Sequence, residues 1–210
     1  QGNFIASLGN LCRWLAQRAE ELGVEIFSGV AGTESRFQDD GRVKGALTGD
    51  MGIDRQGQRK SSFQAGVEMH ARYTLLAEGC RGHLGKRVIR QFRLHAGKDP
   101  QHYGIGIKEI WEVEPARHQQ GRVIHGAGWP LAEHNASGGF FLYHTDQQQV
   151  VVGLITDLNY TNPWLSPYDE FQRMKHHPLF AQTLTGGTRI SYGARAVVKG
   201  GLHSLPKMTF

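Results

Sequence analysis

Two stretches decide the fold of this chain: SGGFFLYH at residues 137–144 and TLLAEGCRGHLGKR at residues 74–87. The first places two glycines inside an apolar run with strand character, where they weaken the strand unless something approaches the bare backbone. The second is an apolar strand that breaks at Glu78 and Gly79 and continues as a basic helix. A strand that turns abruptly into a helix is typical of the corner at which α/β folds bind dinucleotides.

Length and composition narrow the possibilities further. With 210 residues, 39% of them hydrophobic and 28 of them glycine, the chain suffices for one large domain or two small ones. The net charge of +5 is not concentrated in one stretch, which argues against a nucleic-acid partner. No apolar run approaches the roughly 18 residues of a membrane span, and no signal peptide is visible. The start at Gln1 and the strand-like end KMTF predict an internal fragment of a longer protein.

Residues 1–95 alternate between helical and extended patterns, which is typical of part of an α/β domain. Gly23 follows the first helical pattern and predicts its end, because glycine readily takes the left-handed conformation found after a helix. Asp39-Asp40-Gly41 predicts the turn of a β-hairpin. The expected elements are helices over 4–22 and 80–92, a buried strand over 24–27, a strand over 67–77 and a hairpin over 30–53.

After residue 95 the pattern changes to successive extended runs, which favours an antiparallel sheet. Ser166 and Pro167 predict the start of one helix with proline at its first position. The expected elements are extended runs over 103–113, 121–131, 138–144, 149–156 and 188–198, and one helix within 163–180. The sequence therefore predicts a partial α/β domain over 1–95, a β-rich insertion over 96–187, and a return to the first domain over 188–210.

The two opening stretches also supply the candidate binding residues. Gly79 lets the backbone approach a ligand, the helix start near Gly82 offers N–H groups to a pyrophosphate, and Glu78 is placed to accept from a ribose hydroxyl. An ordinary strand–turn–helix explains the same residues, and the chain has no GxGxxG motif. The paired glycines Gly138 and Gly139 fit either a flat ring against the backbone or a bulge in the sheet.

Other reactive side chains favour structural interpretations. His176 and His177 point in different directions on a helix and make a poor metal pair. No nucleophile–base pattern indicates a hydrolase, so no residue is assigned as catalytic and none as a metal ligand. The remaining expectations are core positions for Trp111, Trp129 and Trp164, a surface charge pair for Lys108 and Glu109, and buried thiols for Cys12 and Cys80.

Taken together, the motifs resemble those of the electron transfer flavoprotein–ubiquinone oxidoreductase family. The resemblance is nearly continuous, and its distinctive parts are AEGCRGHL (77–84), YGIGIKEIW (103–111), GWPL (128–131), GGFFLYH (138–144), NPWLSPYDEFQRMKHHP (162–178) and YGARA (192–196). It implies an enzyme associated with a bacterial or mitochondrial inner membrane, which carries FAD and one 4Fe–4S cluster. Such an enzyme accepts electrons from reduced electron transfer flavoprotein and reduces ubiquinone to ubiquinol.

The resemblance also implies a fold, with both α/β and α+β parts. A partial FAD-binding domain of the glutathione-reductase-like type would carry an inserted ubiquinone-binding domain built on an antiparallel sheet. The phosphate-binding glycine loop, the segments that dip into the membrane and the cluster ligands would lie outside these residues. The isolated fragment is therefore expected to be inactive.

Site residues follow from the resemblance by position. The family's quinone-binding glycines fall on Gly138 and Gly139, whose backbone N–H and C=O would bind a quinone carbonyl. Ser137 and Phe140 depart from the Tyr-Gly-Gly-Ser that is usual in the family. The implied FAD contacts are Glu78, Gly79 and Gly82, and at Glu78-Gly79 related flavoproteins commonly have Asp-Gly. Val30 and Ala31 would contact the adenine through their backbone. The chain would return close to the flavin at Tyr192, Gly193, Ala194 and Arg195.

Two alternatives stay open. Another flavin enzyme of the same superfamily, such as a geranylgeranyl reductase or an aromatic hydroxylase, would share the corner at Glu78 and Gly79. Such an enzyme is not expected to share the block at residues 162–178. The second alternative is a fragment that folds but binds nothing.

Overall fold

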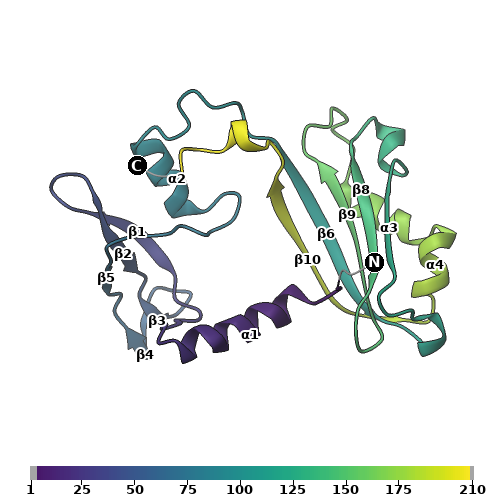
Figure 1. The fold of residues 1–210 in the computed structure, drawn as a ribbon, viewed down its shortest axis with the longest axis horizontal. Helices are drawn as coiled ribbons and strands as arrows, with labels where there is room; N and C mark the ends of the chain where they lie inside the picture. Colours follow the sequence, from purple (N-terminus) through teal and green to yellow (C-terminus); the bar gives the residue numbers. More distant parts are fainter. Residues whose placement is uncertain (1–3, 209–210) are drawn as a thin grey trace. The chain divides into compact units, whose positions relative to one another are not determined.

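The computed structural model describes residues 4–208 (Figure 1). Two compact units divide the chain. Unit 1 comprises the described residues up to 18 together with 99–204, and unit 2 comprises 19–98 together with the described residues from 205 onward. The chain mixes helices and strands, as expected, and every strand pair that the structure describes is antiparallel.

Unit 1 is built on one five-stranded sheet with the order β10-β6-β9-β8-β7 (Figure 1). Its strands are β6 (Tyr103–Glu112), β7 (Val123–Ala127), β8 (Gly138–His144), β9 (Gln149–Asp157) and β10 (Thr188–Val198). These bounds confirm the extended runs expected after residue 95, except that the run over 121–131 is a strand only at β7 and ends in a turn of 3-10 helix. Because β10 pairs with β6 along its whole length, the structure groups residues 188–198 with this sheet and not with unit 2.

One face of this sheet carries the hydrophobic core. Successive strand residues point to opposite faces, so alternate residues of β8 and β9 are buried there. The helices α3 (Pro167–Lys175) and α4 (Pro178–Leu184) supply core side chains from the other side (Figure 1). The most deeply buried apolar residues are Leu131, Leu142, Val150, Val152, Leu154, Phe171, Met174 and Phe180. Trp111 and Trp129 contact this core, whereas Trp164 is 90% exposed, so its expected core position was wrong.

The helical region after β9 begins as predicted and then breaks. Ser166 is the N-cap of α3, its side chain accepts from the N–H of Asp169, and Pro167 is the first helical residue. The single helix expected within 163–180 is two helices, because Pro178 has no N–H and forces His177 into an extended conformation. The imidazole of His177 then caps α4 by accepting from the N–H of Leu179.

The first helix, α1 (Leu8–Glu21), confirms the predicted pattern and its stop signal. Gly23 has a φ of +86°, its N–H donates to the carbonyl of Glu20, and the N–H of Val24 donates to that of Ala19, which closes the helix. The buried strand expected over 24–27 was wrong. Its apolar side chains are at least 42% exposed and no strand forms there, because no described strand pairs with it.

Unit 2 holds a three-stranded sheet of order β1-β2-β5, a two-stranded hairpin of β3 and β4, and the helix α2. Glycine in the left-handed region turns both hairpins, Gly41 between β1 and β2 and Gly57 between β3 and β4, and the first of these confirms the turn predicted at Asp39-Asp40-Gly41. The strand expected over 67–77 is much shorter. The elements are β1 (Gly32–Phe37), β2 (Val43–Thr48), β3 (Met51–Ile53), β4 (Arg59–Gln64), β5 (Glu68–His70) and α2 (His83–Gln91).

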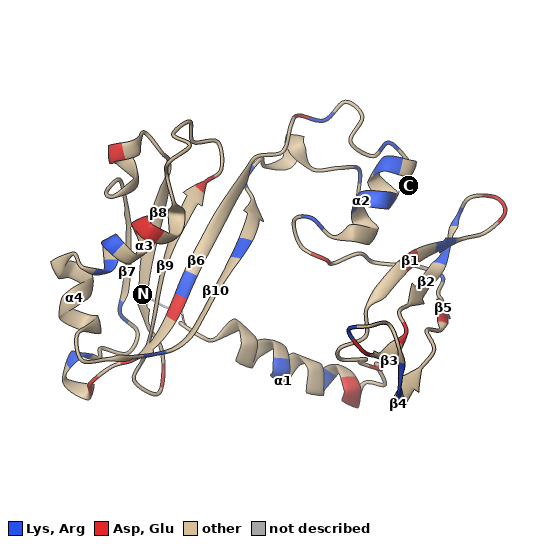
Figure 2. Ribbon diagram, turned by 180° about the vertical axis from the view of Figure 1, so that it is seen from behind, with Lys and Arg blue, Asp and Glu red and all other residues tan. Residues whose placement is uncertain are grey.

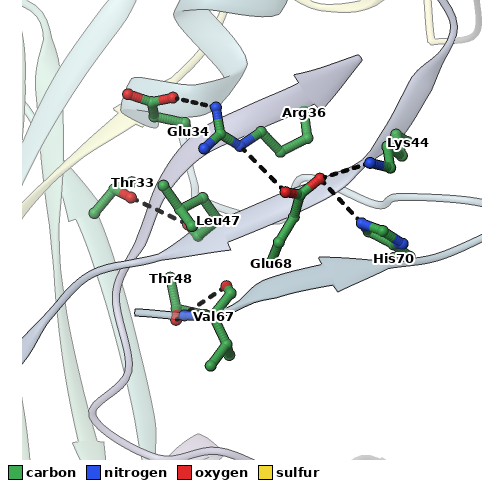
Figure 3. Close-up of polar contacts among 9 residues, drawn as sticks. All are labelled: Thr33, Glu34, Arg36, Lys44, Leu47, Thr48, Val67, Glu68 and His70. Carbon is green, nitrogen blue, oxygen red and sulfur yellow. Dashed lines mark hydrogen bonds and ion pairs between the residues drawn. The ribbon is translucent and has the colours of Figure 1, made fainter. Parts of the chain in front are cut away.

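The three-stranded sheet is held together by ionic as well as backbone contacts. The carboxylate of Glu68 on β5 lies 3.0 Å from the ammonium of Lys44 on β2 and 4.0 Å from the guanidinium of Arg36 on β1 (Figure 3). Its pKa is lowered by the hydrogen bond from Lys44 and then by that from His70. Short turns of 3-10 helix complete the chain at Pro115–Arg117, Leu131–His134 and Leu202–Ser204.

Candidate functional site

The paired glycines have reasons within the protein itself. A Cβ atom on Gly138 would lie 2.1 Å from the carbonyl oxygen of Ile155 on β9, and one on Gly139 would lie 2.7 Å from the carbonyl oxygen of Gly126 on β7. Real Cβ atoms do not approach backbone so closely, so each position needs glycine before any ligand is considered. The close approach of neighbouring strands therefore explains both glycines structurally.

The backbone of Gly138 nevertheless lies at the open end of a strand ladder. The pairing of β7 with β8 ends at Ala127 and Gly139, while β8 continues one residue further. The N–H of Asp157 donates to the carbonyl of Ser137, so Ser137 faces β9. Backbone groups of successive strand residues point to alternate sides, and Gly138 therefore directs its N–H and C=O to the β7 side. β7 ends at Ala127, and the carbonyl of the next residue, Gly128, accepts from the N–H of Ala132.

A polar network anchors the segment 128–137, which leads into Gly138. His134 lies between Asn162, whose amide contacts Nδ1 at 3.1 Å, and Glu170, whose carboxylate contacts Nε2 at 3.0 Å. With the amide nitrogen of Asn162 donating to Nδ1, the proton of a neutral His134 is on Nε2 and is donated to Glu170. Arg173 pairs with both Glu170 and Glu133, and its guanidinium lies over the ring of Trp129.

The five-stranded sheet also holds a buried carboxylate, on β6, that sequence reasoning missed. Glu109 on β6 is 1% exposed, and its carboxylate accepts from Lys175 Nζ at 2.6 Å, from the indole of Trp111 at 2.9 Å and from Arg189 at 3.1 Å. Burial would raise the pKa of Glu109, but hydrogen bonds from Lys175, Trp111 and Arg189 together lower it. The expected surface pair of Lys108 and Glu109 was therefore wrong for Glu109.

A second missed group is His144, which is fully buried on the core face of β8. Its Nδ1 accepts from the N–H of Gln119 at 3.0 Å, which leaves the proton on Nε2. Burial, with smaller contributions from the charges of His118 and Arg122, lowers the pKa of His144 to about 4. The alternation in Phe140, Leu142 and His144 is the signal that could have placed His144 inside.

His144 makes the stability of unit 1 depend on pH. An unfolded chain protonates this imidazole below about pH 6.5, the folded chain only below about pH 4. The unfolded state therefore binds the extra proton between these values, and the free energy of unfolding falls by about 3 kcal/mol as the pH drops from 6.5 to 4. Urea titrations of the wild type and His144→Gln at several pH values measure this. The variant should lack this part of the slope, whereas His102→Gln, a change at an exposed residue, should keep it.

The predicted strand-to-helix corner is a loop before α2, because no strand forms at residues 71–79. The carboxylate of Glu78 accepts from the N–H groups of Leu84 at 3.2 Å and Gly85 at 2.7 Å, at the N-terminus of α2. A Cβ on Gly82 would lie 2.1 Å from Cβ of Glu78. These amides do not fit a pyrophosphate in this conformation, because the anionic side chain of Glu78, which precedes the helix, already binds them. Gly79, with a φ of +79° and no atom within 4 Å of a Cβ built on it, still fits a close backbone approach.

The capping role of Glu78 gives a direct test. Glu78→Ala leaves the amides of Leu84 and Gly85 without an acceptor, and we expect α2 to lose about 1 kcal/mol of local stability. Amide hydrogen exchange in α2 should quicken about fivefold. The control is Glu25→Ala, an exposed carboxylate of the same unit. Unchanged exchange in the Glu78 variant would contradict the capping interpretation.

The other candidate residues fall into both units. Val30 and Ala31 precede β1, and the carbonyl of Ala31 accepts from the N–H of Gly49. Leu84 of α2 lies 3.2 Å from a Cβ built on Gly32, so unit 2 brings this segment close to the corner at Glu78. Tyr192, Gly193, Ala194 and Arg195 lie on β10 in unit 1. Cys12 and Cys80 form no disulfide, and the expected burial was wrong: Cys12 is exposed and Cys80 half-buried.

α2 carries Lys and Arg side chains but no Asp or Glu, and basic and acidic residues are dispersed over the rest of the chain (Figure 2). Within residues 4–208, no helix combines the length and apolar character that a membrane crossing requires.

Comparison with known proteins places this chain among relatives. Residues 103–197 match a family model described as ETF-QO, ubiquinone-binding. The electron transfer flavoprotein–ubiquinone oxidoreductase of Pseudomonas aeruginosa is 59% identical over 100% of this chain and 38% of its own length. The mitochondrial human protein of that name is 50% identical over 100% of this chain and 34% of its own length. The chain thus spans a little over a third of these relatives.

Solved structures show a similar fold at low sequence identity. A flavoprotein/dehydrogenase of Cytophaga hutchinsonii superposes with a TM-score of 0.57 at 16% identity, over 95% of this chain and 45% of that one. This similarity concerns the fold alone. The sequence matches confirm the resemblance that the motifs indicated: over its whole length, this chain is related to part of the electron transfer flavoprotein–ubiquinone oxidoreductases.

Proposed function

We propose that this chain is part of an enzyme that accepts electrons from reduced electron transfer flavoprotein and reduces ubiquinone to ubiquinol. The observation that carries the proposal is the match of residues 103–197 to the ubiquinone-binding family model, within a chain related to such enzymes from end to end. In this proposal, unit 1 contains the ubiquinone-binding domain, inserted into an FAD-binding domain to which unit 2 contributes.

The end of the β7–β8 ladder is the proposed ubiquinone site, at Gly138 and Gly139. The N–H of Gly138 has no β7 residue opposite it and can donate to a quinone carbonyl. Such a bond strengthens as negative charge grows on the oxygen during reduction. A side chain at either glycine would displace neighbouring backbone, so the packing of the sheet keeps both positions without a side chain.

FAD, when bound, supplies the electrons for the quinone. Of the candidate contacts, Gly79 fits a close approach of the cofactor, and Val30 and Ala31 lie in the segment next to α2. Glu78 and Gly82 serve instead to cap α2 in this conformation. A 4Fe–4S cluster with ligands outside residues 1–210, the association with a bacterial or mitochondrial inner membrane and the docking of electron transfer flavoprotein belong to this proposal through the family resemblance of the motifs.

The proposal is tested on the full-length protein that contains this chain. Reduced electron transfer flavoprotein is mixed with the protein and a short-chain ubiquinone, and ubiquinol is followed by its ultraviolet absorbance. We expect ubiquinol formation that requires both the protein and the electron donor. A preparation with its full flavin content that forms no ubiquinol would contradict the proposal. Quinol formation only with another reductant would favour a different flavin enzyme of the superfamily.

A further inference from the structure

The second face of the five-stranded sheet carries a pair of proton-bearing side chains beside the proposed ubiquinone site. His125 of β7 and Tyr143 of β8 both point to the face opposite the core, because the core face takes Ile124, Leu142 and His144. His125 Nε2 lies 2.5 Å from the hydroxyl oxygen of Tyr143, a short hydrogen bond.

The same face has a bare area next to this pair. Ala127 lies directly opposite Gly139 in the ladder, and His125 lies opposite Phe141, two pairs further from the ladder end and next on the same face. The ring of Phe141 covers Gly153 of β9, where a built Cβ would lie 2.4 Å from that ring, and it stacks on Tyr143 with ring centroids 4.8 Å apart. In the register of the two strands, Ala127 and Gly139 lie between His125 and Gly138 on this face.

A flat ring bound through one carbonyl at Gly138 can therefore extend over Ala127 and Gly139. The carbonyl groups of a benzoquinone lie at opposite ends of the ring, and the second one would then point toward His125. Among the described residues of β7 and β8, His125 and Tyr143 are the ionisable side chains of this face. Those on the other strands are Lys108 and Glu112 of β6, Asp157 of β9 and Arg195 of β10.

We propose that His125 is the proton donor for the second quinone oxygen and that Tyr143 is a positioning residue that holds the imidazole. This inference rests on the proposed function. The imidazolium of His125 breaks its Nδ1–H bond and gives that proton to the quinone oxygen, while its Nε2–H stays donated to Tyr143. Two electrons come from the reduced flavin, the second proton comes from water, and the neutral imidazole regains its proton from solvent. One quinone, two electrons and two protons then give one quinol.

The test uses the full-length protein, reduced electron transfer flavoprotein and a short-chain ubiquinone. His125→Gln is expected to slow ubiquinol formation about a hundredfold, because a positioned general acid contributes at least that much. The reduction of the enzyme flavin by electron transfer flavoprotein, measured separately by stopped flow, should stay unchanged. Tyr143→Phe should slow ubiquinol formation less, by about tenfold, and shift the pH profile of kcat. His102→Gln, an exposed residue of the same unit, is the matched control.

Rescue experiments separate chemistry from structure. In His125→Ala, added imidazole should restore ubiquinol formation, and the solvent deuterium isotope effect of the wild type should reappear with it. If the wild type forms ubiquinol and His125→Gln retains its rate and pH profile, the proton-donor role is wrong while the proposed function stands. If the wild type with full flavin content forms no ubiquinol, the proposed function itself fails. Flavin loss in His125→Gln without imidazole rescue in His125→Ala would also overturn the role of His125.

Discussion

Glu109→Gln is expected to lower the free energy of unfolding by about 3 kcal/mol. The substitution keeps the shape of the side chain but removes the negative charge that Lys175 and Arg189 share. The side chain of Lys175 is only 12% exposed, so its ammonium would stay largely buried without a counter-ion. Removing one partner of a buried ion pair costs far more than the net value of the pair, because the remaining charge keeps its desolvation penalty.

The measurement is a urea titration followed by tryptophan fluorescence, since Trp111 donates its indole N–H to Glu109. Lys108→Gln is the matched control: the residue is adjacent on β6 but exposed, and its change should alter stability by less than about 0.5 kcal/mol. Adding Lys175→Met to Glu109→Gln should recover part of the loss, because no lysine charge then stays buried. Equal stability of Glu109→Gln and the wild type would contradict the buried-pair account.

Gly138→Ala is expected to destabilise the sheet by about 2–3 kcal/mol. The new methyl group would lie 2.1 Å from the carbonyl oxygen of Ile155 and 2.5 Å from Cδ1 of Leu131, so β8 must move relative to β9. Overpacking against backbone is costly because strands, unlike flexible side chains, cannot rotate away. The same reasoning applies to Gly139. The side chain in Gly139→Val would lie against the carbonyl oxygen of Gly126 and displace β7.

Gly193→Ala is the control for the glycine variant. Gly193 lies on β10 of the same sheet, and no atom lies within 4 Å of a Cβ built on it. Its substitution should change the free energy of unfolding by less than about 0.5 kcal/mol. Thermal and urea unfolding of the two variants, measured side by side, test the prediction. A Gly138→Ala variant as stable as Gly193→Ala would show that β8 accommodates a side chain there.

Elements with local signals could be predicted from the sequence. Ser166 with Pro167 fixed the start of α3, and Gly23 and Gly41 marked a helix end and a hairpin turn, because cap and turn chemistry is encoded within a few residues. The apolar run at 24–27 shows the opposite case. A strand exists only when another strand accepts its hydrogen bonds, and within the described residues none does.

The candidate site was predictable in position but not in chemistry. Gly138 and Gly139 stood out in the sequence, yet their reason in the structure is the backbone of β9 and β7, which no local pattern reveals. Glu78 precedes α2 as expected, but it follows a loop and not a strand, and its carboxylate caps α2. Glu109 was predicted at the surface because it is charged, although its place in the strand alternation indicated the buried face. Its alternation with Ile105 and Ile107 on β6 was the better guide.

The central claim is that ubiquinone binds at the end of the β7–β8 ladder. A crystal structure of the full-length protein with a short-chain ubiquinone tests it most directly. We expect one quinone carbonyl within hydrogen-bonding distance of the backbone N–H of Gly138, with the ring over Ala127 and Gly139. If the protein reduces ubiquinone but the crystal structure shows the quinone bound elsewhere, with none at the end of the β7–β8 ladder, the claim is wrong.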